Sequence, residues 1–279
     1  MPELPEVETV KRGLVPVMEG FVFDKVILNR PNLRFPFHPE FQSRIEGQTL
    51  IRLGRRAKFL DARLASGDRL LMHLGMSGRF SINKANALGE FVHDPNTNPK
   101  HDHVIFNMSS GAHIIYNDPR RFGFMELLGA DEPSRLDDLG PEPLSNEFNA
   151  PMFRAKLKGR KSKIKAALLD QRVVAGLGNI YVCEALFRAK ISPRRAAGRL
   201  SMNEGENLVR HIKDVITEAI AAGGSSLRDF ANTEGDLGYF QHTFDVYGRE
   251  GEPCDICANP LKRIIQSGRS TFYCSSCQK

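Results

Sequence analysis

Residues 112–128 read AHIIYNDPRRFGFMELL, two apolar runs separated by a short segment of turn formers. Further apolar runs separated by turn residues precede it: FVFDKVIL (21–28), QTLIRLGRRAKFLDARL (48–64), RLLMHLGMSGRFSI (69–82) and HVIFNM (103–108). Turn signals at such short intervals are typical of antiparallel strands in a sandwich or barrel. The pattern therefore predicts a strand-rich region over residues 21–130.

Helices are expected on both sides of this region. Residues 3–20 predict an N-terminal helix, because Val7, Val10, Leu14 and Val17 are spaced 3, 4 and 3 apart and share one face. After residue 131 helical periodicity returns, with a predicted capping box at Ser201 and Glu204 and a predicted stop at Gly223–Gly224. The segment 224–279 is poor in apolar residues and needs a staple to fold.

Four cysteines near the C-terminus supply such a staple. Cys254, Cys257, Cys274 and Cys277 form C-x2-C-x16-C-x2-C, the spacing of a tetrahedral four-thiolate zinc site on a β-hairpin. Two disulfides are the alternative, and the lack of a secretion signal disfavours them. The fifth cysteine, Cys183, is expected to be a small buried helix residue.

The predicted fold is therefore α+β and multidomain. It comprises an N-terminal antiparallel β-sandwich with a flanking helix (1–130), a helical domain (131–223), and a segment (224–279) that ends in a zinc-ribbon hairpin from about residue 245. The first 20 residues lack the basic start and apolar block of a secretory signal, and no run of about 18 apolar residues occurs. A cytoplasmic location without a membrane partner is expected.

Charge adds a weak indication of a polyanionic partner. Lys and Arg exceed Asp and Glu by 39 to 33, a net charge of +6. Six of the ten residues in KLKGRKSKIK (156–165) are basic and none is acidic. Such an excess fits nucleic acid but is also common in proteins that never bind it.

Several motifs together resemble the bacterial formamidopyrimidine-DNA glycosylase family. They occur in order along nearly the whole chain: PELPEVETV (2–10), RRAKFL (55–60), HLGMSG (73–78), KHDHV (100–104), DPRRFG (118–123), GLGNIY (176–181) and TFYCSSCQK (271–279). The resemblance implies a monomeric base-excision repair enzyme, bacterial and nucleoid-associated, that removes 8-oxoguanine and formamidopyrimidines from double-stranded DNA. It also implies lyase activity at abasic sites, a helix–two-turn–helix motif in the helical domain, and one structural zinc ion.

In this family the nucleophile is the N-terminal proline, here Pro2 after removal of Met1. The chemistry agrees, since an α-amine titrates near ~8 against ~10.4 for lysine. A secondary amine that attacks deoxyribose C1′ yields an iminium, an electron sink for β-elimination. By resemblance Glu3 is the general acid/base, Lys58 assists β-elimination, and Arg269 in the hairpin supports δ-elimination and grips phosphates.

The resemblance also assigns DNA contacts. A stacked nucleotide must be everted before C1′ is reachable, and Met76, Arg120 and Phe122 match the residues that fill the vacancy. Phosphate contacts are expected from His73, His101, Lys161, Lys165 and Asn179. Asn179 stands at a predicted helix start, where backbone N–H groups attract anions. Residues 224–240 match the loop over the everted base, whereas the long polar loop at 83–100 has no assigned role.

Two alternatives stay open at this point. One is an oxidised-pyrimidine glycosylase of the endonuclease VIII type, which PELPEVE and the complete DPRRFG motif disfavour. The other is a non-catalytic lesion-binding protein, against which the retention of Pro2, Glu3 and Lys58 argues.

Overall fold

The computed structural model describes residues 2–84, 98–225 and 244–279 of the chain. These residues form two compact units, one drawn from Met1–Ser134 and Gly223–Tyr239, the other from Arg135–Ala222 and Phe240–Lys279. The elements of the first unit are α1 (Leu4–Met18), β1 (Phe23–Leu28), α2 (Phe41–Ile45), β2 (Leu50–Arg56), β3 (Phe59–Leu64), β4 (Arg69–His73), β5 (Arg79–Lys84), the 3-10 turn η1 (Pro99–His101), β6 (Asp102–Met108), β7 (Ala112–Asn117) and β8 (Phe124–Leu128). Those of the second are α3 (Ala150–Leu157), α4 (Ile164–Leu169), α5 (Asn179–Arg188), the 3-10 turn η2 (Ala197–Arg199), α6 (Met202–Ala221), β9 (Lys262–Gln266) and β10 (Arg269–Tyr273).

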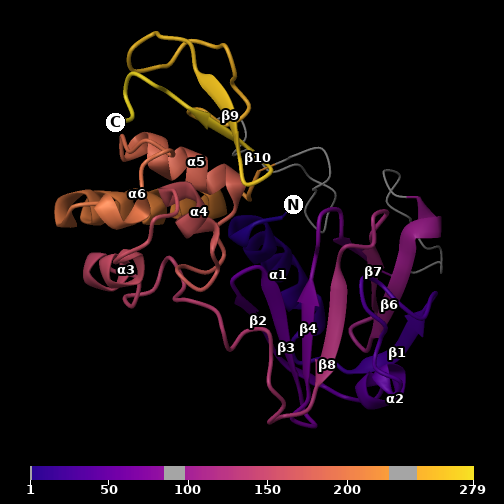
Figure 1. Cartoon of the computed structure of the whole chain (residues 1–279). Helices are drawn as coiled ribbons and strands as arrows, with labels where there is room; N and C mark the ends of the chain where they lie inside the picture. Colours follow the sequence, from indigo (N-terminus) through magenta and orange to yellow (C-terminus); the bar gives the residue numbers. More distant parts are fainter. Residues whose placement is uncertain (1, 85–97, 226–243) are drawn as a thin grey trace. The chain divides into compact units, whose positions relative to one another are not determined.

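The first unit is an antiparallel sandwich (Figure 1). Its two four-stranded sheets have the orders β1-β6-β7-β5 and β2-β3-β4-β8. Phe23 and Phe106 from the first sheet and Leu60 and Met72 from the second are buried in one shared core. Burial of the inward side chains of both sheets is what drives this layered arrangement. The predicted sandwich is confirmed.

Helix α1 flanks the sandwich and begins with a reciprocal cap. Glu3 is the N-cap, and it forms a capping box with Glu6, whose carboxylate accepts the Glu3 N–H at 2.7 Å. The apolar face predicted from the sequence is buried, as expected for a helix that packs on a sheet. The helix ends at Met18, two residues short of the predicted bound, and Gly20 then turns the chain at φ +84°.

The second unit combines a helical bundle with a C-terminal hairpin. Helix α6 starts at the predicted Ser201–Glu204 capping box and ends at Ala221 before the predicted glycine stop. Helix α5 starts at Asn179, as predicted. The hairpin β9-β10 belongs to the same packed cluster as α5, since Phe187 of α5 and Phe272 of β10 are both part of it (Figure 1). The predicted fold class is therefore confirmed, whereas the three-part division of the chain stays a prediction.

A buried carboxylate on α5 attaches the segment that leads into the hairpin. Glu184 is completely buried and accepts backbone N–H groups from Asp245 at 2.7 Å, Val246 at 3.1 Å and Tyr247 at 2.8 Å. Burial raises the pKa of Glu184 to about 7, although the three N–H donors oppose this rise. Because an unsatisfied buried acceptor is costly, these three bonds fix residues 245–247 on α5. None of the helices in the described ranges is long and apolar enough to cross a membrane.

Stability should therefore depend on pH through Glu184. In the folded chain the pKa of this group lies above its ordinary value of 4.5, so the folded state holds a proton that the unfolded state has lost. The stabilisation is complete below about pH 4.5 and is lost as the pH rises through about 7. The difference in unfolding free energy between wild type and Glu184→Gln should therefore become smaller as the pH rises through this window. We expect the decrease to be at most about 3 kcal/mol.

Urea denaturation at a series of pH values measures this difference. Glu206→Gln, an exposed position on α6, is the matched control and should show no trend. A constant difference between wild type and Glu184→Gln from pH 4.5 to 8 would contradict the prediction.

Candidate functional site

The start of the chain is held in place rather than free. Pro2 is buried directly before the N-cap, and Glu3 is only 3% exposed. The second oxygen of Glu6, Oε1, accepts the backbone N–H of Ser225 at 2.8 Å and its hydroxyl at 3.0 Å. A Cβ on Gly224 would lie 3.0 Å from the same oxygen, so glycine permits this approach. One carboxylate thus joins the start of α1 to Gly224 and Ser225, the first residues of the predicted loop at 224–240, of which residues 226–240 lie outside the described part.

The turn that carries Lys58 is attached to the same helix. Glu8 of α1 binds Arg55 at 2.9 Å, and Arg55 in turn donates to the carbonyl of Ala57 at 3.0 Å. Burial opposes ionisation of Glu8, but hydrogen bonds from Lys11 and Arg55 outweigh it and lower its pKa. Ala57 adopts φ 54°, a left-handed conformation that costs energy for a residue with a Cβ. The strained turn leaves Lys58 only 7% exposed.

Met76 lies in the loop between β4 and β5, and Arg120 and Phe122 lie in the loop between β7 and β8. Hydrogen bonds connect these two loops. Ser77, next to Met76, donates its hydroxyl to Asp118 Oδ1 at 2.6 Å, and the same hydroxyl accepts the Arg120 N–H at 3.2 Å. The Arg120 guanidinium lies 4.8 Å from the centre of the Phe122 ring, within cation–π range. Phe122 is 45% exposed, so its ring is accessible on the surface of the first unit.

Asp118 is the centre of this arrangement. It is fully buried, and its Oδ2 accepts the Gly123 N–H at 2.9 Å and the Tyr116 hydroxyl at 3.3 Å. Burial, together with the nearby Asp118 charge, raises the pKa of Tyr116 well above 10, so the phenol stays a donor. A Cβ on Gly123 would lie 1.8 Å from the Tyr116 oxygen, and one on Gly75 would lie 2.3 Å from the Phe122 backbone. The two loops therefore touch through their backbones, which only glycine allows.

The two predicted histidines lie at strand ends beside these loops. The His73 ring is parallel to that of Phe124 at 5.4 Å, and its Nδ1 accepts the Gly75 N–H at 3.0 Å. His101 ends η1, and its carbonyl accepts the Asp118 N–H at 3.0 Å. Burial lowers the pKa of the neighbouring His103, whose Nε2 lies 2.9 Å from the Asp118 carbonyl. Because a carbonyl only accepts, neutral His103 carries its proton on Nε2.

In the second unit, Asn179 and Lys165 converge on the hairpin. The Asn179 amide and the Lys165 ammonium both donate to the Ser270 carbonyl at 2.9 Å. Lys165 also donates to the Thr271 hydroxyl at 2.6 Å and is only 1% exposed. Both side chains thus fix the residue next to Arg269, which is itself exposed. Lys161, by contrast, lies exposed in the loop before α4.

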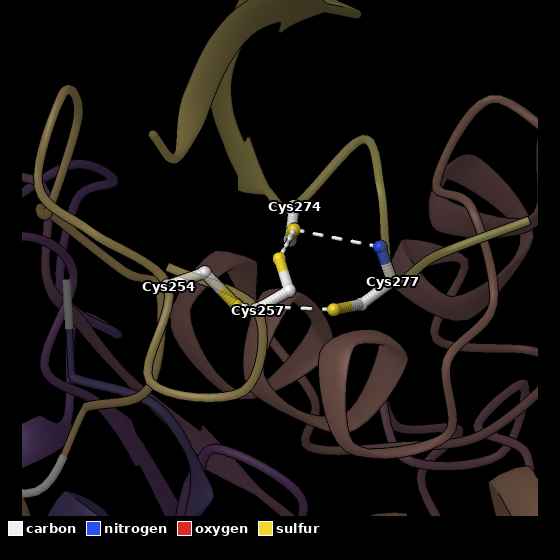
Figure 2. Close-up of side chains that lie close together, drawn as sticks. All are labelled: Cys254, Cys257, Cys274 and Cys277. Atoms are coloured by element: carbon white, nitrogen blue, oxygen red, sulfur yellow. Dashed lines mark hydrogen bonds between the residues drawn. The ribbon is translucent and has the colours of Figure 1, made fainter. Parts of the chain in front are cut away.

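The four C-terminal cysteines form one cluster (Figure 2). Their sulfurs all lie within 4.8 Å of one another, with Cys254 to Cys277 at 3.9 Å and Cys257 to Cys274 at 3.5 Å. Zinc–thiolate bonds of ~2.3 Å in a tetrahedron place sulfurs about 3.8 Å apart, so the cluster fits one zinc ion. All five cysteines are free thiols, which rules out the alternative of two disulfides. Cys183 is buried on α5 as predicted.

Sequence reasoning missed the residues that hold these parts together. Asp118 and Ser77 stood inside recognised motifs, but their contact spans 41 positions. Glu6 lies inside the PELPEVETV motif but was assigned no role, and neither was Glu184. The signal that identifies these acids is their burial, which only the structure shows. Charged residues inside a fold are almost always paired, so each buried acid points to partners.

Replacing Asp118 should loosen both loops. In Asp118→Asn an amide replaces one oxygen, so the hydroxyl of Ser77 or the N–H of Gly123 loses its acceptor. We expect a loss of about 1–3 kcal/mol in unfolding free energy, because the affected group stays buried. Glu250→Gln, which breaks an exposed pair with Arg263, should cost less than about 1 kcal/mol. Urea denaturation measures the unfolding free energy of both variants. Equal losses of unfolding free energy would contradict the role given to Asp118 in joining the two loops.

Zinc removal should unfold the hairpin and leave the sandwich intact. Structural zinc sites supply the folding energy of small ribbons that have little core. We expect Cys257→Ser to lose the metal and residues 251–279 to become sensitive to protease, whereas Cys183→Ala keeps one zinc per chain. Metal content and peptide mapping measure both effects. Full zinc occupancy in Cys257→Ser would show that the quartet is not the site.

Three family models match the chain in sequence order. They are the formamidopyrimidine-DNA glycosylase N-terminal domain at residues 1–125, the H2TH domain of the same family at 139–231, and the zinc finger found in FPG and IleRS at 251–279. The last of these covers the cysteine quartet. It agrees with one structural zinc ion held by these four thiolates.

Relatives match over the full length. A formamidopyrimidine-DNA glycosylase of Bradyrhizobium sp. strain BTAi1 is 59% identical over 293 aligned residues, covering 100% of both chains. The Lactococcus lactis Fpg (MutM) has been solved with DNA containing N7-benzyl-Fapy-dG, an abasic site or an oxidised pyrimidine. These three structures are each 34% identical to this chain, with all of both chains covered and TM-scores of 0.88, 0.88 and 0.87. The chain belongs to the formamidopyrimidine-DNA glycosylase family.

Proposed function

We propose that this protein excises oxidised purines from duplex DNA and then cuts the strand by β,δ-elimination, with the Pro2 amine as nucleophile. The observation that carries the proposal is the fixed N-terminus. Pro2 is buried beside the Glu3–Glu6 capping box, in a chain whose family relatives were solved on damaged and abasic DNA. Proximity of this kind lowers the entropic barrier to attack on a bound sugar.

The proposed reaction runs through a covalent intermediate. The Pro2 nitrogen attacks deoxyribose C1′, and the bond from C1′ to the base breaks as the base leaves with a proton. The attacking nitrogen gives up its proton, and the sugar ring then opens as the C1′–O4′ bond breaks and O4′ takes a proton, which leaves an iminium between Pro2 and C1′. This iminium acidifies the C2′ protons, so loss of one expels the 3′ phosphate, and a second elimination expels the 5′ phosphate. Glu3 is adjacent to the nucleophile and moves the protons. Lys58, fixed through Arg55 and Glu8, assists the first elimination.

Access to C1′ depends on the two loops joined by Asp118. Eversion of the damaged nucleotide leaves a gap in the stack that costs a few kcal/mol. Met76 and the exposed Phe122 ring fill it as apolar wedges, and Arg120 donates to the unpaired base. His73 and His101 bind phosphates close to these loops. The backbone contacts at Gly75 and Gly123 keep the wedges rigid, so binding energy is not spent on ordering them.

The second unit supplies phosphate contacts. Arg269 reaches the phosphates near the lesion from the zinc-stapled hairpin, and Asn179 and Lys161 bind others. Lys165 is buried against Ser270 and Thr271. We therefore assign it the task of holding Arg269 in position, in place of the direct phosphate contact expected from the sequence.

Oxidised pyrimidines are a second candidate substrate class. One structure of the Lactococcus lactis relative contains DNA with an oxidised pyrimidine. We nevertheless favour purines, because the complete PELPEVE and DPRRFG motifs resemble those of the formamidopyrimidine-DNA glycosylases more than those of the endonuclease VIII type.

Blocking the N-terminal amine tests the mechanism and the substrate class together. We compare the chain that begins at Pro2 with one that carries an uncleaved N-terminal extension, on duplexes containing 8-oxoguanine or thymine glycol. The processed chain should excise 8-oxoguanine faster than thymine glycol. The extended chain should lose roughly 10³-fold or more of both base release and strand cleavage, since its amine is an amide.

Binding of both chains to an uncleavable abasic analogue, measured by fluorescence anisotropy, controls for access to the site. Faster excision of thymine glycol by the processed chain would reassign the substrate class. Normal binding without turnover by that chain would instead identify a lesion-binding protein.

A further inference from the structure

A basic hollow in the second unit is built on a paired floor. Segments 160–164 and 195–198 run antiparallel, with the Ile164 N–H bound to the Arg195 carbonyl at 2.8 Å and the Gly198 N–H bound to the Arg160 carbonyl at 3.0 Å. A Cβ on Gly198 would lie 2.9 Å from the Arg160 carbonyl, so glycine lets the segments meet. Backbone pairing thus fixes the floor before any ligand binds.

Six cationic side chains line this hollow, which has a volume of about 1020 Å³: Arg160, Lys161, Lys163, Arg194, Arg195 and Arg199. Two are paired with carboxylates, Arg160 with Asp170 at 3.1 Å and Arg195 with Glu204. In the described part of the chain, Lys161, Lys163, Arg194 and Arg199 make no salt bridge, and all four are exposed. No acidic side chain lines the hollow itself. This concentration of positive charge favours an anion that neutralises it.

The lining also indicates which anion fits. No aromatic or large apolar side chain is present, so there is no platform on which a base could stack. Proteins that hold single strands rely on such stacking platforms, whereas contact with duplex DNA is made mainly by cations on phosphates. The hollow is open and its positive charges are spread along it. It therefore fits the extended phosphate backbone of a duplex better than it fits a small phosphate compound.

We infer that this hollow is an accessory site for the phosphate backbone of duplex DNA, in which Arg194 and Arg199 bind phosphates irrespective of sequence or lesion. The inference rests on the proposed function only in taking DNA as the partner. It adds two residues from the segment before α6 to the predicted contact Lys161. Its task is to hold undamaged duplex during the search, a sequence-independent contribution that chemistry at the lesion does not require.

The salt dependence of binding tests this site. Each lost phosphate contact lowers the slope of log affinity against log salt by about 0.9, so Arg194→Ala/Arg199→Ala should lower it by about 1.8. Between 50 and 200 mM salt the wild type should then lose about 12-fold more affinity than the variant. Undamaged and 8-oxoguanine duplexes should be affected alike, and the single-turnover excision rate at saturating enzyme should be unchanged.

Two further variants make the result specific. Lys156→Ala/Arg210→Ala removes the same charge from exposed positions outside the hollow and should leave the slope near that of wild type. Arg194→Lys/Arg199→Lys keeps the charge and should retain most of the slope. An unchanged slope in the alanine variant, or one matched by the control, overturns the inference even when excision is normal. A lowered slope in a protein that excises nothing supports it while the proposed function fails.

Discussion

A buried carboxylate, Glu6, fixes Pro2 and Glu3 at the start of α1, and the proposed chemistry depends on this constraint. Chain termini ordinarily fray, because few contacts compensate for the entropy lost on ordering them. Here Glu6 accepts the Glu3 N–H with one oxygen and both donors of Ser225 with the other. Pro2 and Glu3 are therefore held against the start of α1, which is what a nucleophile at Pro2 requires. An amine that moved freely would lose the advantage of proximity.

The same device recurs at three other places where distant segments meet. Asp118 joins the loop of Met76 to that of Phe122, Glu184 attaches residues 245–247 to α5, and Lys165 holds the strand that begins at Arg269. In each case one buried ionisable group forms hydrogen bonds with two or three partners. Such groups are costly to bury and costly to disrupt, so they specify a single arrangement of loops that have little apolar surface of their own.

Local signals in the sequence predicted much of this molecule. The cysteine spacing predicted the quartet because each C-x2-C turn is short enough to aim two sulfurs at one ion. Val7 and Leu14 predicted the buried face of α1, and Ser201 with Glu204 predicted a cap. These features depend on residues within a few positions of one another, which periodicity and spacing can detect.

What escaped prediction depends on long-range contacts. Lys165 belongs to a basic run that resembles a solvated surface, yet its partner Thr271 lies 106 positions away. Asp118 was quoted only as part of a motif, since nothing near it in sequence shows that Ser77 is its partner. Arg194 and Arg199 join Lys161 only because two segments about 35 residues apart pair through their backbones.

The most direct test of the central claim is to identify the residue that bonds to the sugar. Borohydride reduction of the chain on abasic duplex, followed by proteolysis and tandem mass spectrometry, locates the deoxyribose remnant. We expect it on the nitrogen of Pro2, in the N-terminal peptide. A remnant on Lys58, or on any other lysine, with an unmodified N-terminal peptide would contradict the account.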